Sequence, residues 1–316
     1  MDSSLDVAVL AGGLSFEREV SLSSGTRVSE ALHRVGVNAR VADVGGDLLT
    51  WLAQDRPDVA VIALHGAAGE DGTIQELLDL NGIPYVGAGA HSCRLAYDKP
   101  TAKELVRRNG VSTPQCVSFA DVAFRDFGAR RILDAVIARL GFPLVVKPSR
   151  GGSSLGIQVV RAGEDLSSAV MTALSYDRSV VIEQFIAGDE VAVVVVDVDG
   201  SPVALPPVQV QFPGDFFDYN AHYTAGVATF SAPPDLPSKQ IDQVMADAVA
   251  AHRVLGMRHI SRSDFIIDGS GTPQYLETAV SPGVTYTSTL PRALEAGGIE
   301  LGTLVAQLVT RAVSGA

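Results

Sequence analysis

Short apolar runs alternate with amphipathic stretches over the first third of the chain. The runs, which are typical of buried strands, cover residues 7–10, 59–64 and 83–86. Residues 17–35 and 72–80 between them have the spacing of helices that bury one face. Repetition of strand, loop and helix predicts a parallel, Rossmann-like α/β domain, with ligands bound beyond the carboxyl ends of its strands.

The pattern changes twice further along the chain. Helical stretches and an apolar hairpin predict a central domain over residues 94–182. Residues 183–316 are rich in strands and close with a helix over 301–313. We therefore expect an α/β protein of three domains, the first covering residues 1–93.

A loop of glycine and serine lies inside the central hairpin. The apolar run 144–146 leads to Lys147, and residues 149–156 follow with four glycines or serines in direct succession, Gly151 to Ser154. Glycine lets backbone N–H groups approach an anion, serine adds donors and lysine adds a positive charge. The loop alone is also compatible with a plain hairpin turn. The Walker pattern is absent, because no Gly-Lys-Ser/Thr opens a helix.

Two carboxylates lie on a predicted hairpin near the C-terminus. Asp264 and Glu277 flank a turn at residues 269–271, so they could lie side by side. Paired oxygens of this kind suit Mg²⁺, which takes a few carboxylates together with substrate phosphates. Arg262 would share the strand face of Asp264 and could neutralise a phosphoryl group or an oxyanion. Two solvent-facing strand residues are the alternative.

Further candidates lie at loop and strand ends. Lys99 could join Lys147 at phosphates, although a surface lysine is the alternative. Glu190 could hold ribose hydroxyls, and Glu183 with Gln184 could supply an adenine edge. In the N-terminal domain, Glu17 could hold an ammonium group. His65 could orient a carboxylate or could be structural.

Composition narrows the function classes. The chain has 316 residues and a net charge of −12, which argues against a nucleic-acid or anionic membrane surface. Two cysteines, Cys93 and Cys116, have neither metal spacing nor a disulfide framework. No apolar run is long enough to span a bilayer, and the acidic N-terminus is unlike a signal peptide. We expect a cytoplasmic protein.

Taken together and in order, these motifs resemble the D-alanine–D-alanine ligase family of the ATP-grasp superfamily. The matching segments are residues 12–22, 64–66, 70–72, 98–99, 146–156, Glu183 with Glu190, 218–219 with Tyr223, 262–264, and Glu277 with 281–283. The resemblance covers nearly the whole chain. It implies a three-domain ATP-grasp enzyme that uses ATP and Mg²⁺ in peptidoglycan biosynthesis, with a homodimer as the expected assembly.

The implied reaction joins two D-alanines or close analogues through an acyl phosphate. In this family pattern Glu17 would hold the first ammonium group, in a network with Ser153 and Tyr223. His65 would lie near the first carboxylate, and Ser288 would bind the second.

The same resemblance assigns residues to the nucleotide. Lys99 and Lys147 would contact the α- and β-phosphates, Glu190 the ribose, and Asp264 with Glu277 would hold Mg²⁺.

Other positions complete the implied site. Arg262 and the Gly283 N–H would stabilise the tetrahedral oxyanion. Ser154, Glu183 and Gln184 would also contact the nucleotide.

Three positions depart from the family pattern. Ala279 replaces an asparagine that is a metal ligand, His222 replaces a lysine that reaches the γ-phosphate, and Glu76 replaces a glycine. The first two departures concern the transferring phosphate and weaken one expected metal site. Two alternatives therefore stay open: a ligase for other amino or hydroxy acids, and a catalytically weak homologue that binds nucleotide or D-amino acid.

Overall fold

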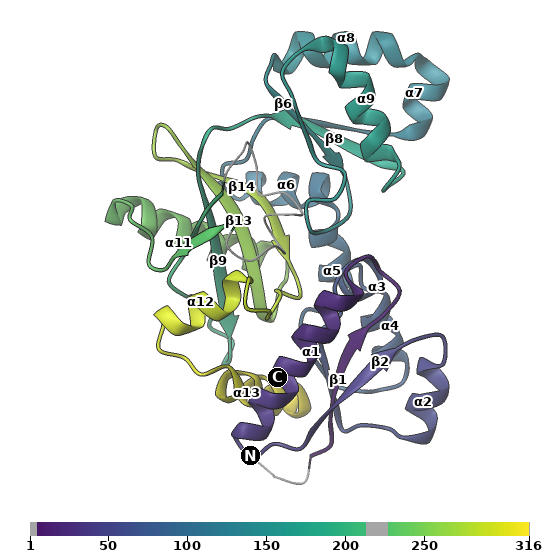
Figure 1. Ribbon diagram of the computed structural model, residues 1–316, viewed down its shortest axis with the longest axis vertical. Helices are drawn as coiled ribbons and strands as arrows, with labels where there is room; N and C mark the ends of the chain where they lie inside the picture. Colours follow the sequence, from purple (N-terminus) through teal and green to yellow (C-terminus); the bar gives the residue numbers. More distant parts are fainter. Residues whose placement is uncertain (1–4, 213–226, 316) are drawn as a thin grey trace.

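The computed structural model describes residues 5–212 and 227–315 and contains three sheets, each covered by helices (Figure 1). The predicted α/β class is confirmed. The N-terminal sheet is parallel, as expected for a Rossmann-like domain. In spatial order its strands are β2 (Ala39–Val44), β1 (Val7–Gly12), β3 (Val59–Ile62) and β4 (Tyr85–Val86).

Both faces of the N-terminal sheet are covered. Its helices are α1 (Arg18–Arg34), α2 (Leu48–Gln54), α3 (Ala67–Glu70) and α4 (Thr73–Leu80). Because side chains alternate along a strand, Val7 and Val9 belong to the core that contains α1, whereas Ala8 and Leu10 belong to the core that contains α2 and α4. Burial on both faces explains the unbroken apolar run of β1.

The middle sheet is antiparallel and contains the predicted hairpin. Its strands, in spatial order, are β5 (Cys116–Ala120), β8 (Ser179–Gln184), β6 (Leu144–Pro148) and β7 (Gln158–Val160). Its helices are α7 (Asp121–Phe127), α8 (Ala129–Leu140) and α9 (Gly163–Leu174). The boundary expected between residues 182 and 183 falls inside β8, because the apolar run there continues into two polar residues that keep the strand pairing.

The large sheet carries the C-terminal hairpin. Its strands are β12 (Thr229–Ser231), β11 (Val208–Gln211), β9 (Gly188–Asp197), β13 (His259–Asp268), β14 (Pro273–Ala279), and β10 (Val203–Ala204) paired to β9. The remaining helices are α5 (Ala90–Tyr97), α6 (Lys99–Arg108), α11 (Ser238–Val254), α12 (Thr289–Ala296) and α13 (Leu301–Ser314).

Two groups of helices pack against elements that are distant from them in sequence. Helices α5 and α6, which we assigned to the central domain, share a core with α11, β9 and β13 of the large sheet. Helix α13 packs on α1 of the N-terminal domain, as seen at the lower end of Figure 1. A Cβ at Gly302 would lie 2.1 Å from the Ala31 carbonyl oxygen, so glycine permits this close approach. These contacts fix the first and last domains against each other.

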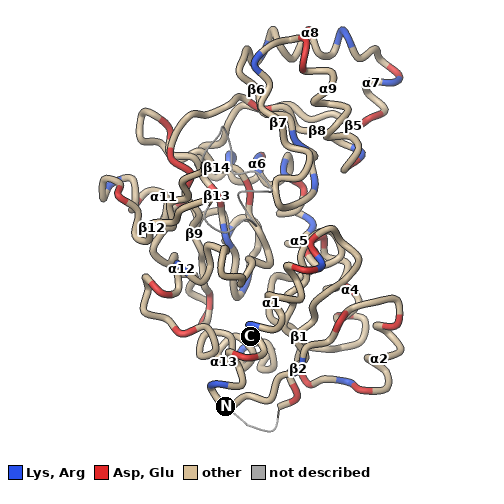
Figure 2. Tube along the Cα trace, viewed as in Figure 1, with Lys and Arg blue, Asp and Glu red and all other residues tan. Residues whose placement is uncertain are grey.

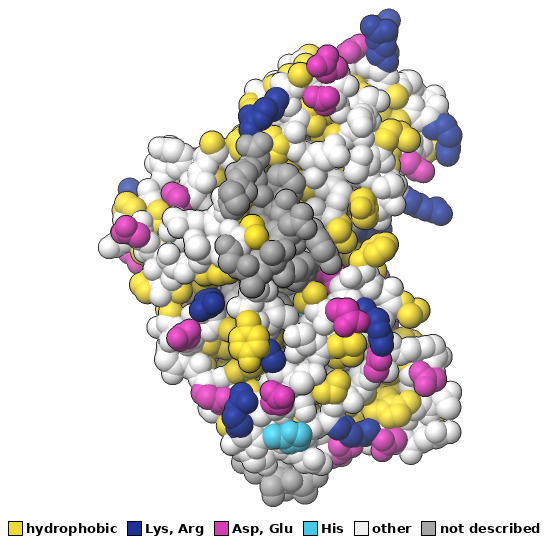
Figure 3. Space-filling view, in the orientation of Figure 1, with side chains coloured by type: hydrophobic (Ala, Val, Ile, Leu, Met, Phe, Trp, Pro, Cys, Tyr) yellow, Lys and Arg dark blue, Asp and Glu magenta, His cyan; other side chains and the backbone are white. Residues whose placement is uncertain are grey.

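Charges of both signs are dispersed over the molecule (Figure 2), and apolar side chains on the face in Figure 3 are scattered among polar ones. Within residues 5–212 and 227–315, every helix is too short or too polar to cross a bilayer.

Candidate functional site

A cavity of about 650 Å³ lies where the three sheets face one another. All candidate site residues in the described part of the chain line it: Glu17, His65, Lys99, Lys147, Ser153, Ser154, Glu183, Gln184, Glu190, Arg262, Asp264, Glu277, Gly283 and Ser288. They come from all three predicted domains, so the fold gathers positions that are far apart in sequence. His222 and Tyr223, the two other candidates, lie outside the described residues.

The glycine–serine loop reaches across the cavity to the N-terminal domain. The Ser153 hydroxyl donates a hydrogen bond to the Glu17 carboxylate. Ser153 has φ 52° and Ser154 has φ 57°, left-handed conformations that aim both side chains from a tight turn. A Cβ at Gly152 would approach Glu17 to 3.2 Å, so glycine there makes room for the carboxylate.

Glu17 is a buried carboxylate without a lysine or arginine partner among the contacts of the described residues. Burial raises its pKa, and the nearby Glu70 carboxylate raises it further, whereas the Ser153 hydrogen bond lowers it. Such a group gains from a positively charged ligand, because an ammonium would repay the cost of burial.

His65 is buried next to Glu17 and is held in one orientation. Its Nε2 lies 3.0 Å from the Ser24 Oγ, which accepts a hydrogen bond from the Val284 N–H at 3.3 Å. The Ser24 hydroxyl and Nε2 therefore share a hydrogen bond that fixes the ring. The other ring nitrogen, Nδ1, lies 3.9 Å from the Glu70 carboxylate.

Lys147 and Glu183 form an ion pair on neighbouring strands of the middle sheet. Lys147 Nζ lies 2.6 Å from Glu183 Oε1, and both side chains are buried. The other oxygen, Oε2, lies 3.0 Å from Nζ of Lys103 on α6. Burial opposes ionisation of Glu183, but Lys103 and Lys147 outweigh it and lower the pKa of that carboxyl. The sequence analysis did not single out Lys103, because a lysine within a predicted helix belongs to no motif that would mark it as a site residue.

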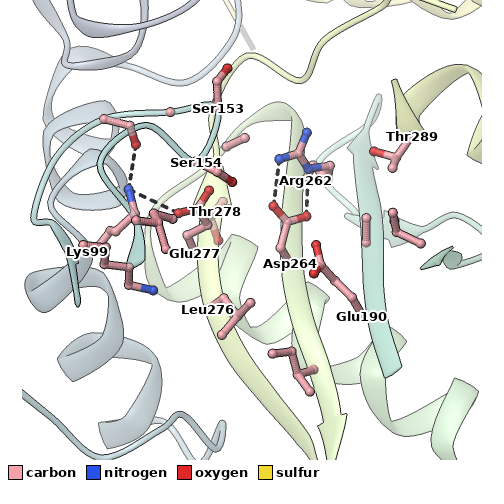
Figure 4. Close-up of a pocket in the computed structure, with 18 of the residues that line it drawn as sticks. Lys99, Ser153, Ser154, Glu190, Arg262, Asp264, Leu276, Glu277, Thr278 and Thr289 are labelled. Carbon is pink, nitrogen blue, oxygen red and sulfur yellow. Dashed lines mark hydrogen bonds and ion pairs between the residues drawn. The ribbon is translucent and has the colours of Figure 1, made fainter. Parts of the chain in front are cut away.

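Asp264 and Glu277 face the same cavity from paired positions of β13 and β14 (Figure 4). Lys99 Nζ lies 3.2 Å from Glu277 Oε2 and donates a hydrogen bond to the Gly151 carbonyl at 2.6 Å. Burial favours the neutral form of Glu277, but Lys99, Lys147 and Arg262 outweigh it and lower its pKa to about 2. Lys99 thus contacts both Glu277, a candidate metal ligand, and the glycine–serine loop.

Arg262 and Asp264 form a bidentate pair on one strand face, as expected from their spacing of two. Nε donates to Oδ1 at 2.8 Å and Nη2 to Oδ2 at 2.7 Å (Figure 4). Burial raises the pKa of Asp264 despite the opposing effect of Arg262.

Glu190 points toward Asp264 from the adjacent strand β9 (Figure 4). Burial raises its pKa to about 8, and the nearby Asp264 adds to the shift. A largely neutral carboxyl can both donate and accept hydrogen bonds, which suits a sugar hydroxyl.

The Gly283–Ser288 segment forms a compact turn at the cavity wall. Ser288 Oγ accepts from the Thr285 N–H at 3.1 Å and lies 2.8 Å from Thr285 Oγ1. A Cβ at Gly283 would come within 2.8 Å of Ser288 Oγ, so only glycine fits there without displacing that hydroxyl.

The donor set fits a magnesium ion held jointly with phosphates. Asp264 and Glu277 supply two carboxylates on one face, and Ala279 lines the same cavity without an oxygen. No cluster of three or more histidine, cysteine or acidic side chains suited to a metal occurs within residues 5–212 and 227–315. Mg²⁺ is commonly bound by one or two carboxylates, water and substrate phosphates. Glu76, the third departure, lies away from this site and pairs with Arg94 at 2.9 Å.

A glycine–serine loop and two lysines on one side, facing paired carboxylates on a second sheet, define an ATP-grasp enzyme. The family model described as D-ala D-ala ligase C-terminus matches residues 105–310, and that of the D-ala D-ala ligase N-terminus matches residues 48–88. The D-alanine–D-alanine ligase of Pelotomaculum thermopropionicum is 39% identical over 98% of this chain and 97% of its own length. That of Geobacter sulfurreducens is 41% identical over 97% of this chain and 93% of its own length.

Comparison with solved structures supports the same family. D-alanine–D-alanine ligase from Bacillus anthracis complexed with ATP has a TM-score of 0.82 at 27% identity, covering 99% of this chain and 98% of that one. VanG D-Ala:D-Ser ligase from Enterococcus faecalis has a TM-score of 0.83 at 27% identity, covering 98% of this chain and 99% of that one. The protein belongs to the D-alanine–D-alanine ligase family and is an ATP-dependent ligase.

Proposed function

We propose that this protein joins two D-alanines, with ATP activating the carboxylate of the first as an acyl phosphate. The observation that carries the proposal is the Ser153–Glu17 hydrogen bond. It places a buried carboxylate, which would gain from an ammonium ligand, directly beside the glycine–serine loop that we expect to bind phosphate. An amino acid with its ammonium on Glu17 would have its carboxylate near the loop and the phosphates. That juxtaposition is what an acyl-phosphate mechanism requires.

The first substrate is held by groups of the N-terminal domain. Glu17 binds its ammonium, and His65, fixed by Ser24, lies near its carboxylate. A carboxylate is a poor electrophile, and phosphorylation turns one of its oxygens into a leaving group. The amine of the second D-alanine then attacks the acyl carbon and phosphate departs.

Lysines and carboxylates hold the nucleotide from opposite sheets. Lys147 and Lys99 offset phosphate charge, and Glu190 takes ribose hydroxyls. Asp264 and Glu277 would hold Mg²⁺, which supplies charge neutralisation at the phosphates when bound. Glu183 and Gln184 lie at the strand end where an adenine edge would be met, and Ser154 adds a hydroxyl in the loop.

Arg262 and Gly283 stabilise the tetrahedral intermediate. Arg262 uses its Nε–H and one N–H of Nη2 to hold Asp264, so the two N–H groups of Nη1 and the second one of Nη2 are left for an oxyanion. The backbone N–H of Gly283 supplies a second donor, and Ser288 takes the second carboxylate. Preorganised donors of this kind provide a large part of acyl-transfer catalysis.

Ala279 limits the metal site. A methyl group cannot coordinate a cation, so water would fill the position of the missing side-chain oxygen. We infer one fully formed Mg²⁺ position at Asp264 and Glu277 and a weaker second one.

A phosphate-release assay with D-alanine, ATP and Mg²⁺, followed by mass spectrometry of the product, tests the function. Release that depends on D-alanine and yields the dipeptide is the expected result. Release only with D-serine or a hydroxy acid as second substrate would assign the specialised ligase instead. ATP binding by calorimetry without release under any of these conditions would refute the ligase proposal.

A further inference from the structure

Helix α6 presents two buried lysines, four residues apart, to two different carboxylates. Lys99 pairs with Glu277 at 3.2 Å, and Lys103 pairs with Glu183 at 3.0 Å. The Lys99 side chain lines the cavity, whereas that of Lys103 is only 1% exposed and does not. Lys103 therefore cannot touch a nucleotide, and the proposed function leaves this buried charge without a role.

Three polar groups surround the Lys103 amine. Its Nζ donates hydrogen bonds to Thr113 Oγ1 at 3.0 Å and to the Tyr275 carbonyl at 3.1 Å, and it forms an ion pair with Glu183 Oε2 at 3.0 Å. Three oxygen atoms around one nitrogen suit the charged ammonium form. Burial lowers the pKa of Lys103, and Glu183 opposes that shift.

We propose that Lys103 is a positioning residue for nucleotide binding, which neutralises Glu183 and so leaves the charge of Lys147 available to phosphates. The inference rests on the proposed function, because it takes Lys147 as a phosphate contact. Its physical basis is charge balance. Two ammonium groups share one carboxylate, so the triad of Lys103, Glu183 and Lys147 carries a net charge of +1 in a nearly dry region.

Without Lys103 the triad would lose its net positive charge. Glu183 and Lys147, 2.6 Å apart, would form a neutral pair, and the charge of Lys147 would be offset by Glu183 before it could serve a phosphate. Coulomb interactions in a partly dry cleft are several times stronger than in water, so the loss would be felt mainly by the phosphates. The affinity for adenosine, which has no phosphate, should hardly change.

The test compares affinities for ATP and for adenosine, measured by displacement calorimetry at fixed free Mg²⁺. Lys103→Met keeps the length of the side chain and removes its charge. We expect the ratio of ATP to adenosine affinity to fall roughly tenfold, the effect of about one screened charge at this range. The double variant Lys103→Met/Glu183→Gln removes one charge of each sign, so the ratio should return to within about threefold of wild type. Because a neutral pair replaces an ion pair, this variant also keeps the test usable if Lys103→Met alone folds poorly.

Thr113→Val is the matched control. It removes one acceptor of Lys103 and the 2.8 Å hydrogen bond to the Tyr275 carbonyl, but no charge. The affinity ratio should stay within about twofold of wild type. A ratio unchanged in Lys103→Met, or an equal loss of ATP and adenosine affinity, or no rescue by the double variant, would overturn the inference.

Lys147→Met separates failure of this inference from failure of the proposed function. A lower ratio in Lys147→Met with an unchanged ratio in Lys103→Met would retain Lys147 at the phosphates and refute the role of Lys103. An unchanged ratio in Lys147→Met would remove the phosphate contact itself, and the inference with it.

Discussion

Asp264 and Glu277 lie directly opposite each other across β13 and β14 because the ladder shifts by one residue beside them. From Ile267 opposite Pro273, the register continues to Phe265 opposite Tyr275 and then jumps to Asp264 opposite Glu277, so Leu276 is the extra residue of a bulge. A regular ladder would put Glu277 opposite Ser263, on the buried face. The bulge brings Leu276 and Glu277 to the cavity side, and the residues that flank them, Tyr275 and Thr278, are buried.

Ala279→Asn should lower the Mg²⁺ concentration that gives half-maximal activity. Ala279 lies opposite Arg262 and lines the cavity, so a side-chain oxygen there would join the carboxylates. We expect a decrease of roughly threefold to tenfold, which corresponds to about one kcal/mol for an added neutral ligand. Titration of phosphate release with Mg²⁺ measures it.

Ala279→Leu is the control for this change, because leucine has a similar size to asparagine but no oxygen. It should not lower the Mg²⁺ requirement. Equal Mg²⁺ curves for wild type and Ala279→Asn would show that position 279 does not contribute to the metal site.

Ser153→Ala should move the acidic limb of the pH profile upward. Glu17 binds an ammonium only when ionised, and burial raises its pKa, with Glu70 as the second cause and Ser153 as the opposing one. Loss of the Ser153 hydrogen bond removes a group that favours the ionised form, so kcat/KM for D-alanine should decline at a higher pH than in wild type. kcat/KM from pH 5 to 8, measured in about half-unit steps, locates the limb.

Ser154→Ala serves as the comparison, since Ser154 shares the left-handed backbone of Ser153, whereas the side-chain hydrogen bond that lowers the pKa of Glu17 comes from Ser153. Its acidic limb should coincide with that of wild type. A limb displaced equally in both variants would mean that loop conformation, rather than the bond to Glu17, sets the pH dependence.

His222→Lys should raise phosphate release above neutral pH. His222 lies outside the described residues, and its proposed role comes from the family pattern, in which a lysine contacts the γ-phosphate. An unperturbed histidine loses its charge near pH ~6.5, and lysine stays charged to about pH 10. Assistance from histidine should therefore fade as pH rises, and lysine should remove that decline. Superimposable pH–rate profiles for the two proteins would exclude His222 from the reaction.

The sequence alone allowed the hairpin and its paired carboxylates to be predicted, since the turn at 269–271 and the strand patterns on either side are local signals. The bulge at Leu276 could not be predicted, because nothing in that residue type separates a bulged position from a regular one. The site residues could be named because the family motifs are dense and ordered. Lys103 carries no such motif, and its partners Glu183 and Tyr275 are distant in sequence.

The packing partners of the helices were harder to predict than the helices themselves. Helix α6 has the pattern of any amphipathic helix, and the pattern does not say which sheet its apolar face will cover. Ala102 and Val106 of α6 pack on the large sheet, although the neighbouring sequence continues into the middle one. Packing partners across such distances depend on the three-dimensional arrangement, which a periodic pattern does not encode.

Two buried histidines, outside the cavity, make the fold sensitive to acid. His252 Nδ1 lies 2.8 Å from Ser261 Oγ, and His259 Nδ1 accepts a hydrogen bond from the Gly87 N–H at 3.0 Å. The Nε2 atoms of both rings are buried, and neither has a hydrogen-bond partner among residues 5–212 and 227–315. Burial lowers the pKa of each to about 4, with Arg258 adding to the shift at His259 and Asp197 opposing it at His252.

His259→Asn should reduce the loss of stability in acid. Both histidines are neutral in the fold down to about pH 4, whereas the unfolded chain protonates them near pH 6.5, so the unfolding free energy must fall as pH drops between these values. The loss is on the order of 3 kcal/mol for each ring. Asparagine tolerates the φ of 65° at position 259, can still accept from Gly87 and cannot be protonated, so the variant should lose less stability between pH 7 and 4.5. Urea unfolding at several pH values measures the difference, with the exposed His91→Asn as control, which should follow wild type. If the His259→Asn curve also followed wild type, protonation of His259 would have no part in the acid sensitivity.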